Sequence, residues 1–302
     1  MPDLRIIDAH HHLTDLSRSY PWLEGPAVAR YHGDDRPLRR DYDVDDYLED
    51  AHDVTLLASV HVENGAADAL AETAWIDRLA RERRVPTVHV AHVSLLDPDA
   101  ARQLEEHASY AVTRGIRDIL NWHPDPVYTH RDRDGIMQDP AWLAAFGRLE
   151  GLDLSFDLQV FPSQLHDAAA LAARFPGTRI VLDHAGMPIG RDAESVAGWR
   201  AGMRAVAAES GVTVKISALG TNDHAWTPES IRPFVLDTLD AFGADRTMFG
   251  SNFPVDGLYS TYSELYAAFD ALTSGLSADE RAAVFSGTAD RAYRIGVTAP
   301  EA

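Results

Sequence analysis

The sequence predicts an α/β protein, a single distorted TIM-like (β/α)₈ barrel that forms one domain over residues 1–302. Three observations favour this class. Short apolar runs alternate with helical patterns from end to end, the runs number eight, and no glycine-rich phosphate loop follows the first run. Eight βα units are the number that closes a barrel, and an open doubly wound sheet is the alternative.

The eight predicted strands are spaced so that a helix fits after each of them. Most are continuous apolar runs, which are typical of strands covered on both faces. Apolar residues recur at helical spacing from Leu165 and again from Ile231. The predicted strands are residues 4–8, 54–62, 86–93, 115–119, 153–160, 178–183, 212–217 and 246–250.

Two long irregular segments interrupt this pattern, residues 14–43 after the first strand and residues 121–138 after the fourth. In a barrel, the loops that follow the strands lie at the catalytic face. Long loops at such a face usually cover a substrate. We therefore expect both segments to lie over the mouth of the barrel.

Composition limits the partners of this chain. Its formal net charge of −20 disfavours nucleic acid and anionic membranes, so we expect a small-molecule substrate; a homo-oligomer is compatible with the composition. The absence of cysteine excludes disulfides, thiolate zinc sites and cysteine nucleophiles. The sequence has no signal-peptide pattern and no apolar run of membrane length, which predicts a cytoplasmic protein.

Polar residues recur where the predicted strands end. Because the carboxyl ends of barrel strands converge, these residues predict one site. Five of the 14 histidines lie at such ends, a clustering that scattered surface histidines would not show. The strand-end residues are His10, His12, His61, Glu63, His92, Arg117, Asp118, Gln159, His184, Lys215, Ser217, Asn252 and Asp256.

Spacing suggests how some of these side chains point. His10 and His12 are two residues apart on an extended chain, so both imidazoles face the same way and can bind a divalent metal or a substrate oxygen. His61 and Glu63 repeat this spacing and are predicted substrate-binding residues, together with His92 and Gln159.

The sequence also predicts the partner of Arg117 and the orientation of Asp183. A buried Arg117 needs an anionic partner, either Asp118 or a substrate carboxylate. Asp183 directly precedes His184, so on a strand it is expected to point out of the barrel.

Four motifs together resemble the amidohydrolase-2 branch of the amidohydrolase superfamily. They are DAHHHL at residues 8–13, GIR at 115–117, LDHAG at 182–186 and FGSNFPV at 249–255. The pattern is nearest to the lactonases of that branch, which open pyrone-dicarboxylate and sugar-acid lactones. The resemblance runs along the whole chain in order.

The resemblance implies a distorted barrel that hydrolyses a cyclic ester or a related carbonyl bond. It places His10, His12 and His184 around the reacting carbonyl and gives Arg117 a substrate acid group to hold. Some members bind a divalent metal and some lactonases work without one. We therefore expect at most one divalent ion, zinc by preference, held by His10, His12 and His184.

One residue departs from the superfamily pattern. Asn252 stands where the superfamily usually has an aspartate, and a carboxamide cannot take a proton from water. Asp256, four residues on, is the predicted base, with Asn252 orienting water or substrate. Glu63, Asp183 and the histidines are the other candidates for this base.

The sequence thus predicts a hydrolase of a small cyclic ester that carries a carboxylate or hydroxyls. A metal-dependent non-oxidative decarboxylase of the same superfamily is one alternative, although Asn252 counts against it. A non-catalytic barrel that binds a ligand is the other.

Overall fold

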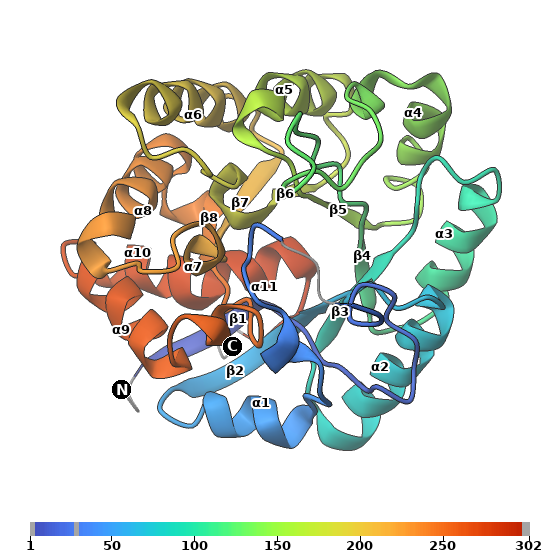
Figure 1. The fold of residues 1–302 in the computed structure, drawn as a ribbon, viewed down its shortest axis with the longest axis horizontal. Helices are drawn as coiled ribbons and strands as arrows, with labels where there is room; N and C mark the ends of the chain where they lie inside the picture. The colour runs from blue at the N-terminus through green and yellow to red at the C-terminus, as the bar shows by residue number, and fades with distance from the viewer. Residues whose placement is uncertain (1–3, 27–29, 298–302) are drawn as a thin grey trace.

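The computed structural model describes residues 4–26 and 30–297. Eight parallel strands form one sheet whose spatial order is the chain order, and helices surround the strands (Figure 1). The predicted TIM-like barrel is therefore confirmed. An open doubly wound sheet would show a reversal of strand order, and there is none among the described strands.

All eight predicted strands are present, with boundaries that differ by a few residues. The first strand is longer than predicted and includes His10 and His11. The strands are β1 (Arg5–His11), β2 (Thr55–Val62), β3 (Val88–His92), β4 (Thr113–Arg117), β5 (Ser155–Leu158), β6 (Ile180–Leu182), β7 (Val212–Ile216) and β8 (Thr247–Phe249).

Helices follow the strands and form the outer layer. The helical spacing from Leu165 and Ile231 corresponds to α5 and α8. The α-helices are α1 (Val44–Asp50), α2 (Ala69–Arg83), α3 (Ala100–Ala108), α4 (Pro140–Phe146), α5 (Leu165–Arg174), α6 (Ala193–Ala207), α7 (Leu219–Asn222), α8 (Pro228–Phe242), α9 (Tyr262–Leu272), α10 (Ala278–Ala282) and α11 (Thr288–Tyr293). No helix in the described parts of the chain is long and apolar enough to cross a bilayer.

The core has two layers, as expected of a barrel. Val60, Val62, Val90 and Met248 belong to a cluster inside the barrel, which also includes Tyr293 of α11. A larger cluster fills the space between the strands and the surrounding helices. Alternate side chains of each strand thus pack in different layers of the core.

The seam between β8 and β1 closes just beyond the end of β8. The amide of Asn252 donates to the carbonyl of His10 at 2.7 Å, and the amide of His12 donates to the carbonyl of Phe253 at 2.8 Å. These bonds bring the first and last of the four motifs together at the mouth.

A buried carboxylate strengthens this seam from the helix side. Asp8 Oδ1 accepts from the amide of Ser251 at 2.8 Å, and Asp8 Oδ2 accepts from Ser251 Oγ at 2.7 Å. Tyr47 and Tyr262 also donate to Asp8 Oδ2, at 2.9 and 3.2 Å. Asp8 therefore fixes the segment that presents Asn252.

Candidate active site

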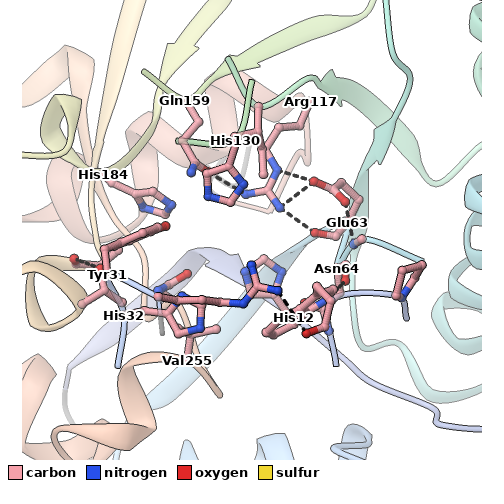
Figure 2. Close-up of a pocket in the computed structure, with 18 residues that line it drawn as sticks. His12, Tyr31, His32, Glu63, Asn64, Arg117, His130, Gln159, His184 and Val255 are labelled. Carbon is pink, nitrogen blue, oxygen red and sulfur yellow. Dashed lines mark hydrogen bonds and ion pairs between the residues drawn. The ribbon is translucent and has the colours of Figure 1, made fainter. Parts of the chain in front are cut away.

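A cavity of about 310 Å³ lies at the carboxyl ends of the strands. Its size suits a small ring compound better than a long chain. Six of the predicted strand-end residues line it, and Figure 2 shows most of them facing one another: His12, Glu63, Arg117, Gln159, His184 and Asn252.

The two long segments cover this cavity, as predicted. Segment 14–43 contributes Trp22, Tyr31 and His32, and segment 121–138 contributes His130. The lining combines aromatic rings with polar and charged side chains, so the cavity is amphipathic. Such a lining suits a ring that has both C–H faces and oxygen substituents.

Arg117 forms a buried ion pair with Glu63, which follows β2. Arg117 Nε donates to Glu63 Oε1 at 2.7 Å, and Nη2 donates to the Glu63 carbonyl at 2.7 Å. Burial raises the pKa of Glu63, but Arg117 outweighs burial and holds that pKa at about 2. The pair is thus ionised with no net charge. Nη1 donates to Gln159 Oε1 at 3.1 Å and keeps a second N–H for a ligand.

The expectation that Asp118 is one of two possible partners for Arg117 is wrong. Asp118 accepts from Trp142 Nε1 at 3.1 Å and pairs with Arg131, away from the cavity. Neighbouring residues on a strand point to opposite faces, so Arg117 and Asp118 do not meet.

His12 presents a proton acceptor at the cavity. Its Nδ1 lies 2.8 Å from the carbonyl of Val62. A carbonyl only accepts, so Nδ1 carries the proton and Nε2 keeps a lone pair. Burial lowers the pKa of His12 to about 4, and the imidazole is neutral at pH 7.

His184 lies beside Ser217, at the ends of β6 and β7. Its Nδ1 is 2.8 Å from Ser217 Oγ, and burial lowers its pKa to about 3. His184, Ala218 and Asn252 all line the cavity with φ values of 58°, 53° and 56°. Left-handed backbone is strained for residues other than glycine, and such strain concentrates at functional sites.

A charged cluster lies below the cavity, inside the barrel. Lys215 Nζ is 2.5 Å from Asp157 Oδ2, 3.1 Å from Asp183 Oδ1 and 3.3 Å from His10 Nδ1. All four side chains are fully buried. Burial raises the pKa of Asp183, but Lys215 outweighs it and holds that pKa well below its usual value.

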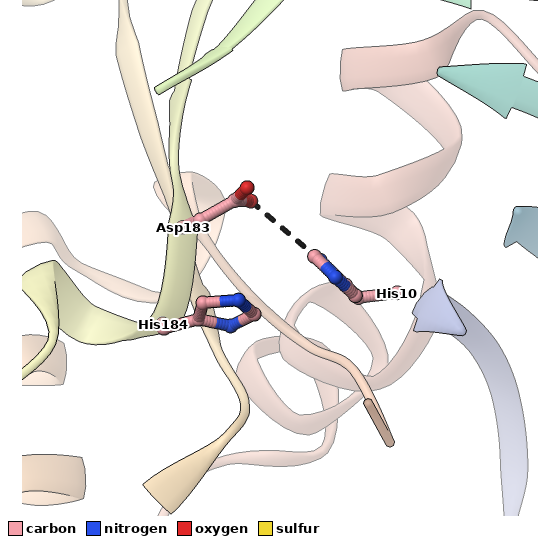
Figure 3. A group of neighbouring side chains, drawn as sticks. All are labelled: His10, Asp183 and His184. Carbon is pink, nitrogen blue, oxygen red and sulfur yellow. Dashed lines mark ion pairs between the residues drawn. The ribbon is translucent and has the colours of Figure 1, made fainter. Parts of the chain in front are cut away.

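The prediction that Asp183 points out of the barrel is therefore wrong. Strand β6 ends at Leu182, and the chain then turns, with His184 in a left-handed conformation. Alternation no longer applies past the strand end, so Asp183 and His184 both face inward. Figure 3 shows them beside His10, whose ring centroid is 4.6 Å from that of His184.

His10, Asp183 and His184 form a group that can hold one divalent cation. Their candidate ligand atoms lie within 4.8 Å of one another. Two imidazoles and one carboxylate are typical zinc donors. His10 Nε2 and both Asp183 oxygens are buried without an aligned hydrogen-bond partner among the described groups, so the residues fit an ion. His12, the third predicted ligand, is outside this group and is replaced by Asp183.

His61 does not line the cavity. Its Nδ1 lies 3.0 Å from His89 Nδ1, and Thr73 Oγ1 links His89 Nε2 at 3.1 Å to His107 Nδ1 at 2.9 Å. Thr73 and His107 belong to α2 and α3, so this chain of side chains joins the sheet to the helices.

The prediction that His61 and Glu63 point together is wrong. Val60 and Val62 face the barrel interior, which leaves His61 on the helix side. Glu63 comes after the last residue of β2 and turns toward the cavity. His92 is also absent from the lining; its Nδ1 lies 3.2 Å from the carbonyl of Arg117.

Asp256 lies one layer behind the cavity wall, with Asn252 in front of it. Burial raises the pKa of Asp256 to about 7, and the nearby amide of Asn252 lowers it by less. Neither carboxylate oxygen has an aligned donor among the described groups. A carboxyl group with this pKa accepts protons near neutral pH. The role of Asp256 as base stays a prediction.

The prediction from the sequence missed some residues of the site or gave them no role. Asp157 interrupts an apolar strand with a charge, as Lys215 does, and this pattern is a signal that could have indicated an internal ion pair. Tyr31, His32 and Asn64 also line the cavity, but their side chains carry no pattern beyond membership of a loop or strand end.

Residues 7–295 match the amidohydrolase-2 family model, which is described as Amidohydrolase. The chain belongs to this family, and the resemblance of the four motifs is confirmed. It is an amidohydrolase-family enzyme.

Three similar proteins span almost the whole chain. The uncharacterized protein y4mH of Sinorhizobium fredii is 38% identical, covering 98% of this chain and 100% of its own. An L-fucono-1,5-lactonase of Burkholderia multivorans is 34% identical, with 96% of each chain covered. A crystal structure of an amidohydrolase from Burkholderia multivorans with bound zinc is 30% identical, covers 96% of this chain and 99% of that chain, and superposes with a TM-score of 0.80.

Proposed function

We propose that this protein hydrolyses a small, neutral, hydroxylated lactone, the cyclic ester of a sugar acid. The observation that carries the proposal is the Arg117–Glu63 pair in a cavity of about 310 Å³. The similarity to an L-fucono-1,5-lactonase supports the same substrate class.

The ion pair distinguishes hydroxyl from carboxylate substrates. Glu63 already neutralises Arg117, so a substrate carboxylate would bring an uncompensated negative charge beside Glu63. Arg30, the other arginine in the lining, lies 3.9 Å from Asp35. Neutral hydroxyls instead match the paired donors and acceptors of Arg117, Gln159 and Glu63.

The reaction adds water to the lactone carbonyl and breaks the ring C–O bond, which yields an open hydroxy acid. With Ser217 Oγ donating to its Nδ1, His184 carries its proton on Nε2, and this N–H donates a hydrogen bond to the carbonyl oxygen as negative charge develops there. Asn252 positions the water, and Asp256, which lies behind Asn252, is the proposed acceptor of the water proton. The proton then goes to the ring oxygen that leaves.

A divalent ion would be held by His10, Asp183 and His184 and would polarise the same carbonyl as a Lewis acid, in place of the hydrogen bond from His184 Nε2–H. The remaining groups act without it. Arg117 and Gln159 hold the ring hydroxyls, and His12 Nε2 accepts a hydrogen bond from one of them or from the water.

A substrate panel tests the proposal. Purified protein is incubated with 1,5- and 1,4-lactones of sugar acids, a pyrone dicarboxylate and hydroxybenzoates, while acid and carbon dioxide release are both recorded. We expect acid release, fastest for neutral sugar-acid lactones, that is lost in His184→Asn. Release of carbon dioxide would indicate a decarboxylase. Tight binding of a metabolite without turnover anywhere in the panel would indicate a non-catalytic barrel.

A further inference from the structure

Lysine occurs once in this chain. Of the 27 lysine and arginine residues, only Lys215 is a lysine, and it is fully buried inside the barrel. An arginine at this position would need room for a planar guanidinium, whereas an ammonium is a compact point charge. The barrel interior therefore suits the compact ammonium of a lysine at this position, whereas every other basic residue of the chain is an arginine.

The ammonium of Lys215 donates to Asp157 and His10 and forms an ion pair with Asp183. Asp157 Oδ2 lies at 2.5 Å, Asp183 Oδ1 at 3.1 Å and His10 Nδ1 at 3.3 Å. Tyr293 donates to Asp157 Oδ2 at 2.7 Å and so completes the surroundings of that carboxylate. One ammonium thus lies between two buried carboxylates.

The contact with His10 fixes an imidazole tautomer. An ammonium has no lone pair, so Lys215 can only donate, and His10 Nδ1 must accept. The contact of His10 Nδ1 with Asp183 Oδ1 is longer, at 3.6 Å, which is beyond hydrogen-bond distance. The proton of a neutral His10 is therefore on Nε2, which is buried and has no aligned partner within residues 4–26 and 30–297.

We propose that Lys215 is the resident cation of the site: it sets His10 as an Nε2–H donor and weakens divalent-metal binding by His10, Asp183 and His184. Two features of the contacts cause this. A metal ligand needs a lone pair, and His10 has its Nε2 lone pair replaced by N–H and its Nδ1 lone pair occupied by Lys215. Asp183, the only carboxylate of the group, already has a cation at 3.1 Å.

The single lysine makes the tautomer directly measurable. Protein labelled with ¹⁵N at histidine and lysine side chains gives one lysine Nζ signal, and His10 is assigned by its loss in His10→Asn. We expect His10 in the Nε2–H form in the wild-type protein and a change of its ¹⁵N pattern in Lys215→Met. An Nδ1–H tautomer in the wild-type protein would overturn the proposal.

Zinc affinity is the second readout. Protein stripped with a chelator is titrated with zinc by calorimetry, without substrate, so the result is separate from the lactonase proposal. We expect Lys215→Met to bind one zinc ion about tenfold or more tightly than wild type, the scale on which neighbours of metal ligands act. The gain should disappear in Lys215→Met combined with His184→Asn.

A second variant covers the chance that Lys215→Met does not fold. Lys215→Met with Asp157→Asn removes the cation and one carboxylate together, and it leaves Asp183 as a ligand. This double variant should show the same gain in zinc affinity and a larger rise of melting temperature with zinc than wild type. Equal or weaker zinc affinity in whichever variant folds would contradict the role of Lys215.

Discussion

Two sets of buried histidines lie on opposite sides of the same strands. His10, His12 and His184 face the barrel interior or its cavity, whereas His11, His61 and His89 face the helices, where His107 of α3 joins them. Burial lowers the pKa values in both sets, for example to about 3 for both His184 and His89. A shifted pKa therefore does not separate a functional histidine from a structural one; the side of the strand does.

The helix-side set is linked mainly to itself. His11 stacks on Tyr47 at 4.0 Å between ring centroids, and His61 and His89 continue through Thr73 to α3. The interior set instead lies among Arg117, Lys215 and carboxylates, around a cavity. Variants of the helix-side set should consequently lose stability, whereas variants of the interior set should lose catalytic activity.

The largest effect is expected at Asp256. Asp256→Asn removes the proton acceptor and keeps the shape, so kcat should fall by about 10²–10⁴-fold, the usual contribution of general acid–base catalysis. Steady-state kinetics on a sugar-acid lactone measures this, with unfolding curves as the control. A near-native kcat in Asp256→Asn, alongside a large loss in His12→Asn, would move the base to His12.

Arg117 should give the next largest effect. Arg117→Met is expected to lower kcat/KM by about 10²-fold, or about 3 kcal/mol. It also leaves Glu63 buried and unpaired, so the free energy of unfolding should fall by about 3–5 kcal/mol. The matched variant is Arg117→Met with Glu63→Gln, which should regain stability but not activity. Recovery of kcat/KM in that double variant would leave Arg117 with a structural role only.

The pH dependence of the reaction should report Asp256. Its pKa is raised to about 7, and a base works only when deprotonated. We expect kcat/KM to rise about tenfold per pH unit below 7 and to level off above it. His12 and His184, with pKa values of about 4 and 3, stay neutral throughout and add no step between pH 5 and 8. A flat profile over this range would contradict the assignment.

The smallest catalytic effect is expected on the helix side. Thr73→Val keeps the shape of the side chain but leaves His89 Nε2 and His107 Nδ1 without their partner. The free energy of unfolding should fall by about 1–3 kcal/mol, while kcat/KM changes by less than about twofold. A large loss of kcat/KM at unchanged stability would show that this chain of histidines serves the reaction.

The fold followed from the sequence because eight apolar runs and their spacing are strong, redundant signals. Six residues of the cavity lining also followed, since strand ends of a barrel converge whatever their side chains are. The errors occurred where alternation was extended past a strand end, at Glu63 and Asp183, or was not applied, at His61 within β2 and at Asp118 directly after β4. A residue with left-handed backbone, such as His184, changes the side of the sheet to which the neighbouring side chains point. The sequence carries no local signal for this backbone conformation.

The most direct measurement compares one histidine from each set, His184→Asn and His61→Asn, for both kcat/KM and free energy of unfolding. We predict that His184→Asn lowers kcat/KM by about 10²-fold with little change in the free energy of unfolding. His61→Asn should lose about 1–3 kcal/mol of stability and keep kcat/KM within about twofold of wild type. The opposite result, an inactive but stable His61→Asn and an active His184→Asn, would contradict the claim that the side of the strand separates the two sets.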